Sequence, residues 1–166
     1  MKRFYEYLYK YGLHDCTIDQ LFCENEKIIF CFDSGIYELN VSGVETTLTK
    51  SCKMIIEIDK FISQNICQHI EINQISKKRF SEISCEKFAK IVNKFKFDID
   101  MHYYSYFCNT ILLKGSANNQ DYEILISEVK QVLFRFDWKL QQTNTLQTES
   151  FNPFKAIANW ITSLFN

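Results

Sequence analysis

Apolar and polar residues alternate along several long segments, and this pattern constrains the fold of the chain more than any other feature. Successive side chains of a β-strand point to opposite faces of the sheet, so a period of two predicts strands with one buried face. The alternation is clearest at residues 28–32, 44–58, 97–107 and 122–138, and residues 33–35 supply a turn signal. The sequence therefore predicts a mostly antiparallel, twisted sheet.

Three other segments have the period of a helix with one apolar face. Residues 3–11 stop at Gly12, residues 84–95 begin at a serine suited to an N-cap, and residues 153–165 begin with the one proline. We therefore expect an α+β fold, in which a sandwich or partly open barrel is flanked by N-terminal, central and C-terminal helices.

The length of 166 residues is within the usual size of one domain. Residues 141–150 are rich in Gln and Thr, almost without apolar side chains, and predict a polar linker. We expect a single β-rich domain over residues 1–140 and an amphipathic helix over residues 151–166. Because an exposed apolar stripe is a liability in water, that helix should dock on the domain or on a second copy of the chain.

Composition argues against several functional classes. With 46% hydrophobic residues and a formal net charge of -1, the chain is too apolar for a disordered protein and too neutral for a binder of nucleic acid driven by phosphate contacts. It contains neither a GxGxxG nor a GxxxxGK[ST] pattern. No stretch approaches the roughly 18 to 20 apolar residues of a membrane helix. We expect a cytoplasmic protein that binds no cofactor, nucleic acid or membrane.

The cysteines are odd in number and scattered, and none lies in a C-x-x-C arrangement. Neither a disulfide framework nor a zinc site is indicated, so we expect reduced residues of the core. The seven positions are Cys16, Cys23, Cys31, Cys52, Cys67, Cys85 and Cys108.

An acidic cluster with one histidine follows the predicted central helix. Asp98, Asp100 and His102 alternate, so on a regular strand they share one face at intervals of about 6.6 to 6.8 Å. Neighbours in this row could share a divalent ion that activates water, with His69 or Glu71 from another strand, which would make the protein a metal-assisted hydrolase. A solvated sheet face explains the pattern equally, because nothing fixes further ligands, and we assign no catalytic or metal-binding residue.

Tyrosines follow this cluster directly. Tyrosine combines a large contact area with a polar hydroxyl, which suits a surface that binds a protein, although such residues also pack in cores with the hydroxyl at the rim. The candidate binding surface consists of Tyr103, Tyr104, Tyr106, Asp98, Asp100 and His102.

His14 and Asp15 are adjacent at the end of the first predicted helix. On a strand, neighbouring side chains point to opposite faces, so we expect no dyad between them. His14 could join the metal site of the hydrolase hypothesis. We favour a structural role for both, at the junction of the helix and the sheet.

The triplet Leu13-His14-Asp15, followed by Ile18, an acidic turn at residues 24–26 and an apolar strand, resembles the start of bacterial immunity-type proteins of polymorphic toxin systems and of related β-rich domains. In that family a Leu/Phe-His-Asp triplet precedes the first strand, and the resemblance covers about the first 35 residues. It implies a non-enzymatic protein that neutralises a protein partner by binding it, with no catalytic residues. The residues leave open a metal-assisted hydrolase and a self-associating structural protein.

Overall fold

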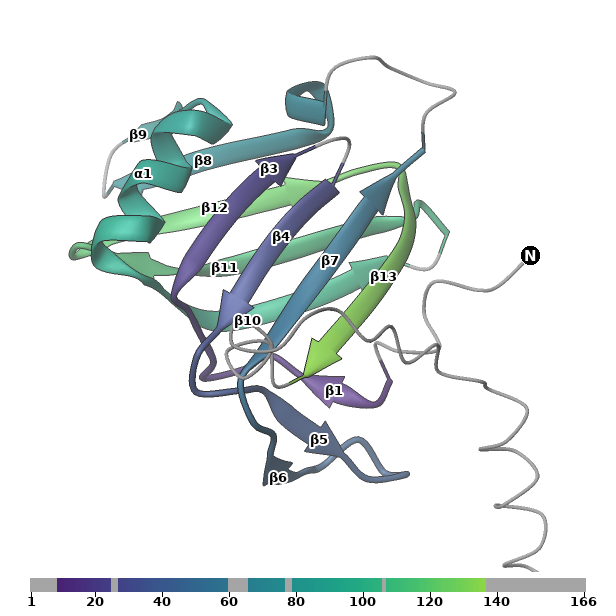
Figure 1. Cartoon of the computed structure of the whole chain (residues 1–166). Helices are drawn as coiled ribbons and strands as arrows, with labels where there is room; N and C mark the ends of the chain where they lie inside the picture. Colours follow the sequence, from purple (N-terminus) through teal and green to yellow (C-terminus); the bar gives the residue numbers. More distant parts are fainter. Residues whose placement is uncertain (1–8, 25–26, 60–65, 77–78, 106, 137–166) are drawn as a thin grey trace, which may run out of the picture.

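Strands dominate the structure, a computed structural model that describes residues 9–24, 27–59, 66–76, 79–105 and 107–136. Within these ranges the chain forms thirteen β-strands, the 3-10 helix η2 (Ile66–His69) and a single α-helix (Figure 1). The strands make three sheets, and neighbouring strands are antiparallel throughout. None of the described helices is long and apolar enough to cross a membrane.

The largest sheet has six strands in the order β2-β10-β11-β12-β8-β9. Its centre is a meander, because β10, β11 and β12 are consecutive in the chain and pair with one another. The strand bounds are β2 (Thr17–Ile18), β10 (Phe97–Ser105), β11 (Thr110–Ala117), β12 (Gln120–Ile126), β8 (Ile70–Ser76) and β9 (Arg79–Glu82).

A second sheet of four strands has the order β13-β7-β4-β3, and a small third sheet has the order β1-β5-β6. The bounds in the second sheet are β13 (Val129–Phe136), β7 (Cys52–Ile58), β4 (Lys27–Phe32) and β3 (Gln20–Glu24). Those in the third are β1 (Tyr11–Gly12), β5 (Tyr37–Leu39) and β6 (Glu45–Leu48).

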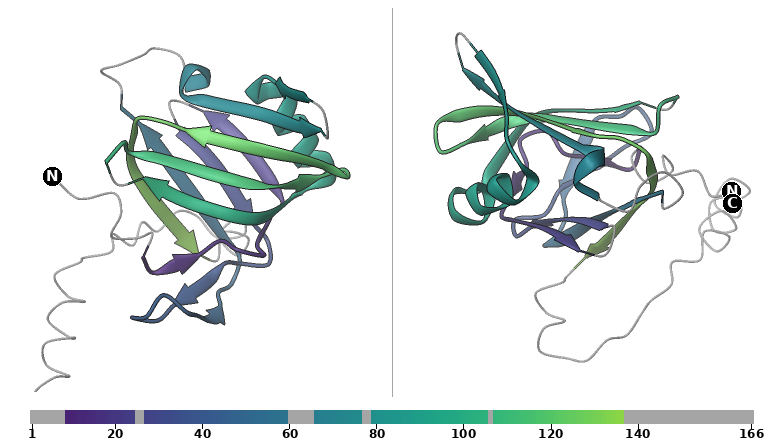
Figure 2. Two further views of the ribbon diagram at one scale, coloured as in Figure 1. Left: turned by 180° about the vertical axis from the view of Figure 1, so that it is seen from behind. Right: turned by 90° about the horizontal axis from the view of Figure 1, so that it is seen from above.

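The six-stranded and four-stranded sheets lie face to face as two layers, and the core fills the space between them (Figure 2). Along most strands of these two sheets, apolar residues at alternate positions point inward. Each large apolar side chain that is fully buried contributes about 1.5–3 kcal/mol relative to an exposed one. The inward residues include Phe30, Phe32, Met54 and Ile56 from one sheet and Phe97, Ile99, Leu113 and Ile124 from the other.

Helix α1 (Cys85–Phe95) covers the gap between the layers beside β3 and β8 (Figure 1). It begins at the expected place, because the hydroxyl of Ser84 accepts a hydrogen bond from the backbone N–H of Lys87. Phe88 and Val92, one turn apart, are fully buried. The central helix expected over residues 84–95 is therefore present.

The expectation of an α+β fold flanked by three helices is wrong, because the described residues are mostly β. Tyr9 and Lys10 form a turn, and Tyr11 begins β1 where the first helix was expected. The ring centroid of Tyr11 lies 4.9 Å from that of Phe134 and 5.2 Å from that of Phe136. This aromatic segment therefore packs against β13. Residues 3–8 of that helix, and the predicted linker and C-terminal helix, lie outside the described residues.

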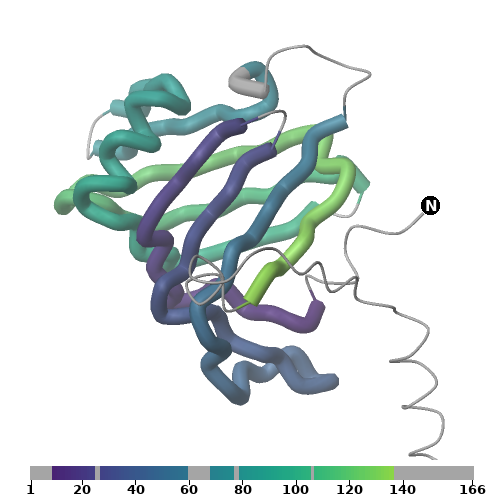
Figure 3. The backbone as a smooth tube through the Cα atoms, viewed as in Figure 1, coloured from purple at the N-terminus to yellow at the C-terminus, as the bar shows by residue number. Residues whose placement is uncertain are grey.

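The segment 122–138, expected as one alternating face, instead crosses from one layer to the other (Figure 3). Glu128 has φ +56°, and this left-handed residue turns the chain between β12 and β13. Ile124 therefore points into the core from the six-stranded sheet, and Val132 points into it from the opposite sheet. Two short strands of opposite layers thus share a pattern that resembles one long strand.

Candidate functional site

Strand β10 carries an irregularity at the residues that the sequence singled out. Its pairing with β11 runs from Asp98 to Ser105 but shifts between Ile99 and Met101, so Asp100 is an extra residue without a counterpart. Such a bulge reverses the side-chain alternation of everything that follows it. Met101 consequently lies opposite the half-buried Lys114 on the outward face. His102 lies opposite the fully buried Leu113 on the inward face.

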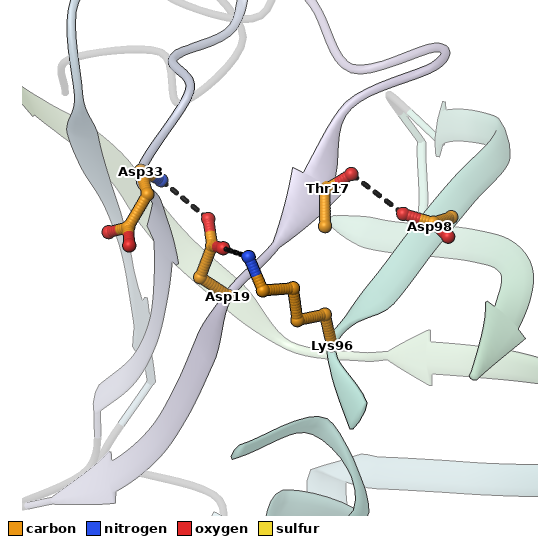
Figure 4. Close-up of polar contacts among 5 residues, drawn as sticks. All are labelled: Thr17, Asp19, Asp33, Lys96 and Asp98. Carbon is orange, nitrogen blue, oxygen red and sulfur yellow. Dashed lines mark hydrogen bonds and ion pairs between the residues drawn. The ribbon is translucent and has the colours of Figure 1, made fainter. Parts of the chain in front are cut away.

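The three candidate metal ligands therefore do not share a face, contrary to the expectation from a regular strand. Asp98 points outward and its carboxylate accepts a hydrogen bond from the hydroxyl of Thr17 at 2.6 Å (Figure 4). Asp100 is exposed at the bulge, whereas His102 is half-buried on the inward side. Burial lowers the pKa of His102, and the nearby charge of His14 acts in the same direction. Among the described residues no three His, Cys, Asp or Glu side chains could hold one metal ion.

The two helper residues of that hypothesis lie elsewhere. Three strand spacings separate β8 from β10, so the exposed side chain of Glu71 is at least about 14 Å from the aspartates. His69 ends η2 and is 7% exposed, and its Nε2 has no hydrogen-bond partner in the described part of the chain. The structure does not bring either residue to Asp98.

The bulge also reverses the faces of the two adjacent tyrosines of the candidate surface. Tyr103 points outward and is 60% exposed. Tyr104 points inward, with its ring 5.3 Å from that of His102 and its hydroxyl buried without a partner among the described residues. Burial raises the pKa of Tyr104. Tyr106 lies outside the described residues.

Tyr103 is the most exposed member of an apolar row across three neighbouring strands. The register places Tyr103 of β10 beside Leu112 of β11, and Leu112 beside Leu125 of β12. Met101, which is 42% exposed, lies on the same outward face, and the two leucines are half-buried. We call Met101, Tyr103, Leu112 and Leu125 the outer patch.

Acidic side chains lie at one end of the outer patch and beside its Leu125. Asp98, Asp100, Asp121 and Glu71 are all exposed on or beside this face. The ammonium of Lys114 is already engaged by the carboxylate of Glu123, at 2.6 Å. The rim is therefore mainly negative, although the chain as a whole is nearly neutral.

Among the described residues, the backbone edge of β10 next to the outer patch is paired along only part of its length. On this side β2 pairs only with Phe97 and Asp98, and the backbone of residues 15 and 16 exchanges hydrogen bonds with Ile99. From Asp100 to Ser105, no described strand pairs with this edge. An extended segment of another chain could hydrogen-bond there.

A buried carboxylate, which the sequence pattern did not reveal, joins several elements on another side (Figure 4). Asp19 is 7% exposed and lies between β2 and β3. One of its oxygens is 2.6 Å from the ammonium of Lys96, and the other accepts the backbone N–H of Asp33 at 2.6 Å. The hydrogen bond and charge of Asp19 raise the pKa of Lys96. The arrangement is structural, and its ion-pair partners lie 77 residues apart.

The side chains of His14 and Asp15 contact each other, contrary to the expectation that they diverge. The His14 Nδ1 atom lies 3.0 Å from the Asp15 carboxylate. Both residues lie in a turn rather than a strand, and Asp15 has φ +56°. The pair is exposed, so it contributes little to stability, about 0–1 kcal/mol. The backbone N–H of Asp15 donates a hydrogen bond to the carbonyl oxygen of Ile99, and this bond attaches the turn to β10.

Two hollows of the described region have linings without a catalytic arrangement. A cavity of about 10 Å³ beside helix α1 has an apolar lining that includes Phe30, Phe88 and Ile124. A shallow cleft of about 300 Å³ lies near Leu48 and Phe136, where Glu38 and Lys50 are the charged lining residues. The outer patch is the feature of this region best suited to recognition, because it combines exposed apolar area with a charged rim.

Comparisons with protein-family models, with curated proteins and with solved structures find no match to this chain. The functional interpretation therefore depends on the residues and geometry of the molecule.

Proposed function

We propose that this chain is a non-enzymatic protein-binding module that uses the outer patch to hold a protein partner. The observation that carries the proposal is the exposure of Tyr103 at the β10 end of an apolar row that has acidic side chains beside it. Interface cores are enriched in Tyr and Met and surrounded by polar side chains, and a few aromatic residues supply most of the binding energy.

The charge around the outer patch favours one kind of partner. Asp98, Asp100, Asp121 and Glu71 would repel the phosphates of a nucleic acid but attract lysine and arginine side chains. We therefore expect a protein with an apolar depression bordered by basic residues. The open edge of β10 beside the patch would add backbone hydrogen bonds if that partner presents an extended segment.

Resemblance in the first 35 residues supports a more specific form of the proposal. The triplet Leu13-His14-Asp15 is similar to the start of bacterial immunity-type proteins. In this form the chain acts in the cytoplasm and inhibits a toxin by occupying its basic surface. No metal-assisted step is part of the proposal, since Asp98, Asp100 and His102 do not converge.

The test uses purified products of the genes next to the one that encodes this chain, with binding measured by calorimetry. A product that is toxic to cells and binds the chain is expected among them. Tyr103→Ala should weaken that binding at least about tenfold, which is typical of an exposed aromatic anchor at an interface. Tyr9→Ala is the matched control, because Tyr9 is 70% exposed in the turn before β1. It should bind like the unchanged chain.

Two results would overturn the proposal. One is that no neighbouring product binds, or that Tyr103→Ala binds as tightly as the control. The other is a dimer of the unchanged chain in solution that Tyr103→Ala converts to monomers. That result would assign the outer patch to self-association.

A further inference from the structure

Cys23 of β3 and Cys85, the first residue of helix α1, place their sulfur atoms 2.9 Å apart. Both residues are reduced in the structure. A disulfide bond has a sulfur–sulfur distance of roughly 2.0 Å, so the two atoms need to approach by less than about 1 Å. We propose that these two cysteines form a reversible disulfide that links α1 to β3, and this inference does not depend on the proposed function.

The contacts around helix α1 fix the position of the two thiols relative to each other. Ser84 caps the helix at its first turn, and the backbone N–H of Ile83 donates to Ile72 of β8, so the segment before Cys85 is attached on both sides. Two turns further along α1, the side chain of Asn93 accepts the backbone N–H of Leu21 at 2.7 Å and donates to its carbonyl at 3.2 Å. Helix α1 is thus attached to β8 just before its start and to β3 near its end, and the thiol contact lies between these two attachments.

Access also suits a stepwise reaction at this pair. Cys23 is half-buried, whereas Cys85 is 5% exposed, so a small oxidant reaches Cys23 first. The cysteines of the core differ, because Cys16 and Cys52 are at most 3% exposed. Burial raises the pKa of Cys16 to about 11 and that of Cys52 to about 12, which keeps them protonated and unreactive at neutral pH.

The oxidant we assign is hydrogen peroxide. The Cys23 thiol releases its proton, and its sulfur attacks one peroxide oxygen, so that an S–O bond forms while the O–O bond breaks. The hydroxide that leaves takes up a proton and becomes water. The Cys85 sulfur then attacks the Cys23 sulfur, forming the S–S bond and expelling a second hydroxide, which takes the Cys85 proton. Two thiols lose two electrons, and one peroxide becomes two waters.

The experiment treats the full reduced chain with hydrogen peroxide, blocks the remaining thiols under denaturing conditions and identifies linked peptides by mass spectrometry. Trypsin releases residues 80–87, which contain Cys85 alone, and residues 11–27, which contain both Cys16 and Cys23. Fragmentation of the linked pair should place the bond on Cys23. Two of the seven thiols should be lost and then recovered with dithiothreitol.

Variants and a second readout test the assignment. Cys16→Ala should keep the link between the two peptides, whereas Cys23→Ala should abolish it. The bond closes a loop between residues 62 apart, so the oxidised chain should melt roughly 5 °C or more above the reduced chain. Peroxide that oxidises the exposed Cys108 without linking Cys23 to Cys85 would overturn the proposal, as would a link that involves Cys16 instead. The same treatment in denaturant should give mixed pairings, which shows that the native contact selects the pair.

Discussion

The carboxylate of Asp19 lies 2.6 Å from the ammonium of Lys96, and this ion pair connects the link between β2 and β3 with the end of helix α1. The carboxylate is buried, whereas the lysine is mostly exposed. The second oxygen of Asp19 also accepts the N–H of Asp33, just after β4. The side chain of Asp19 therefore connects the segments around Lys96 and Asp33 at the point where the chain passes from β2 in one layer to β3 in the other (Figure 4).

We expect Asp19→Ala to lower the free energy of unfolding by about 2–3 kcal/mol, because it removes the acceptor of two hydrogen bonds. Lys96→Met should lower it by about 1–2 kcal/mol, since a buried carboxylate loses one of its partners. Urea denaturation measures both. Lys94→Met, in the exposed last turn of the same helix, is the control and should change stability by less than about 0.5 kcal/mol. Equal effects of the two lysine variants would contradict a specific role for Lys96.

Asn93 pairs with the backbone of Leu21 much as a neighbouring strand would, and so covers the edge of β3. Asn93→Ala should destabilise the protein by about 1–2 kcal/mol and should accelerate hydrogen exchange at the N–H of Leu21. Asn93→Asp keeps the acceptor but loses the donor, so its effect on that N–H should be smaller. Exchange at Leu21 that is the same in all three proteins would show that Asn93 does not protect the edge.

Alkaline pH should destabilise the fold through three core thiols. Burial raises the pKa of Cys52 to about 12 and those of Cys16 and Cys31 to about 11, above the ordinary value of about 9. Above pH 9 the unfolded chain therefore releases protons that the folded chain retains. Each such thiol should lower the free energy of unfolding by about 1.4 kcal/mol per pH unit until the pH reaches its folded pKa.

The slope of stability against pH between about 9 and 10 measures this effect, in a window below the ordinary pKa of tyrosine and lysine. Cys52→Ala should reduce that slope by the contribution of one thiol, whatever it does to stability at neutral pH. Cys108→Ala is the control, because Cys108 is exposed. A slope that is unaltered by Cys52→Ala would contradict the prediction.

Gly115 pairs with Ile99 at the bulge of β10, where the two backbones approach closely. A β-carbon at Gly115 would lie 1.9 Å from the carbonyl oxygen of Asp98 and 2.9 Å from the ring of Phe97. Gly115→Ala should therefore destabilise the protein by about 3 kcal/mol or more, as measured by thermal and urea unfolding. Gly43 has φ +76° with open space around it, so Gly43→Ala should cost only about 1 kcal/mol. A neutral Gly115→Ala would contradict the close contact.

The candidate site illustrates how far a period of two can be extrapolated. Up to Ile99 the inward and outward residues of β10 follow the alternation, and Phe97 and Ile99 are buried as expected. The bulge at Asp100 then reverses the faces, so His102 and Tyr104 point inward while Tyr103 points outward. No residue type announces this bulge, because it arises from the pairing of β10 with β11 and from the space left by Gly115.

The sequence alone determined the features that depend on residues close together in the chain. The alternation at residues 28–32 places Phe30 and Phe32 in the core, and Ser84 with the apolar face after it specifies helix α1. Such features are local because side-chain period and capping act within a few residues. The aromatic residues before Gly12 were ambiguous for the same reason, since Tyr11 suits a helix or a strand until Phe134 packs against it.

Only the tertiary structure decided which distant residues meet. The crossing at Glu128 puts β12 and β13 in opposite layers, and the folded chain brings Asp19 to Lys96 and Cys23 to Cys85 across 77 and 62 residues. Those contacts depend on strand order and on the docking of α1, which are set by the packing of the whole core rather than by any short pattern. The outer patch has the same origin, because three strands must pair in one register to align Tyr103, Leu112 and Leu125.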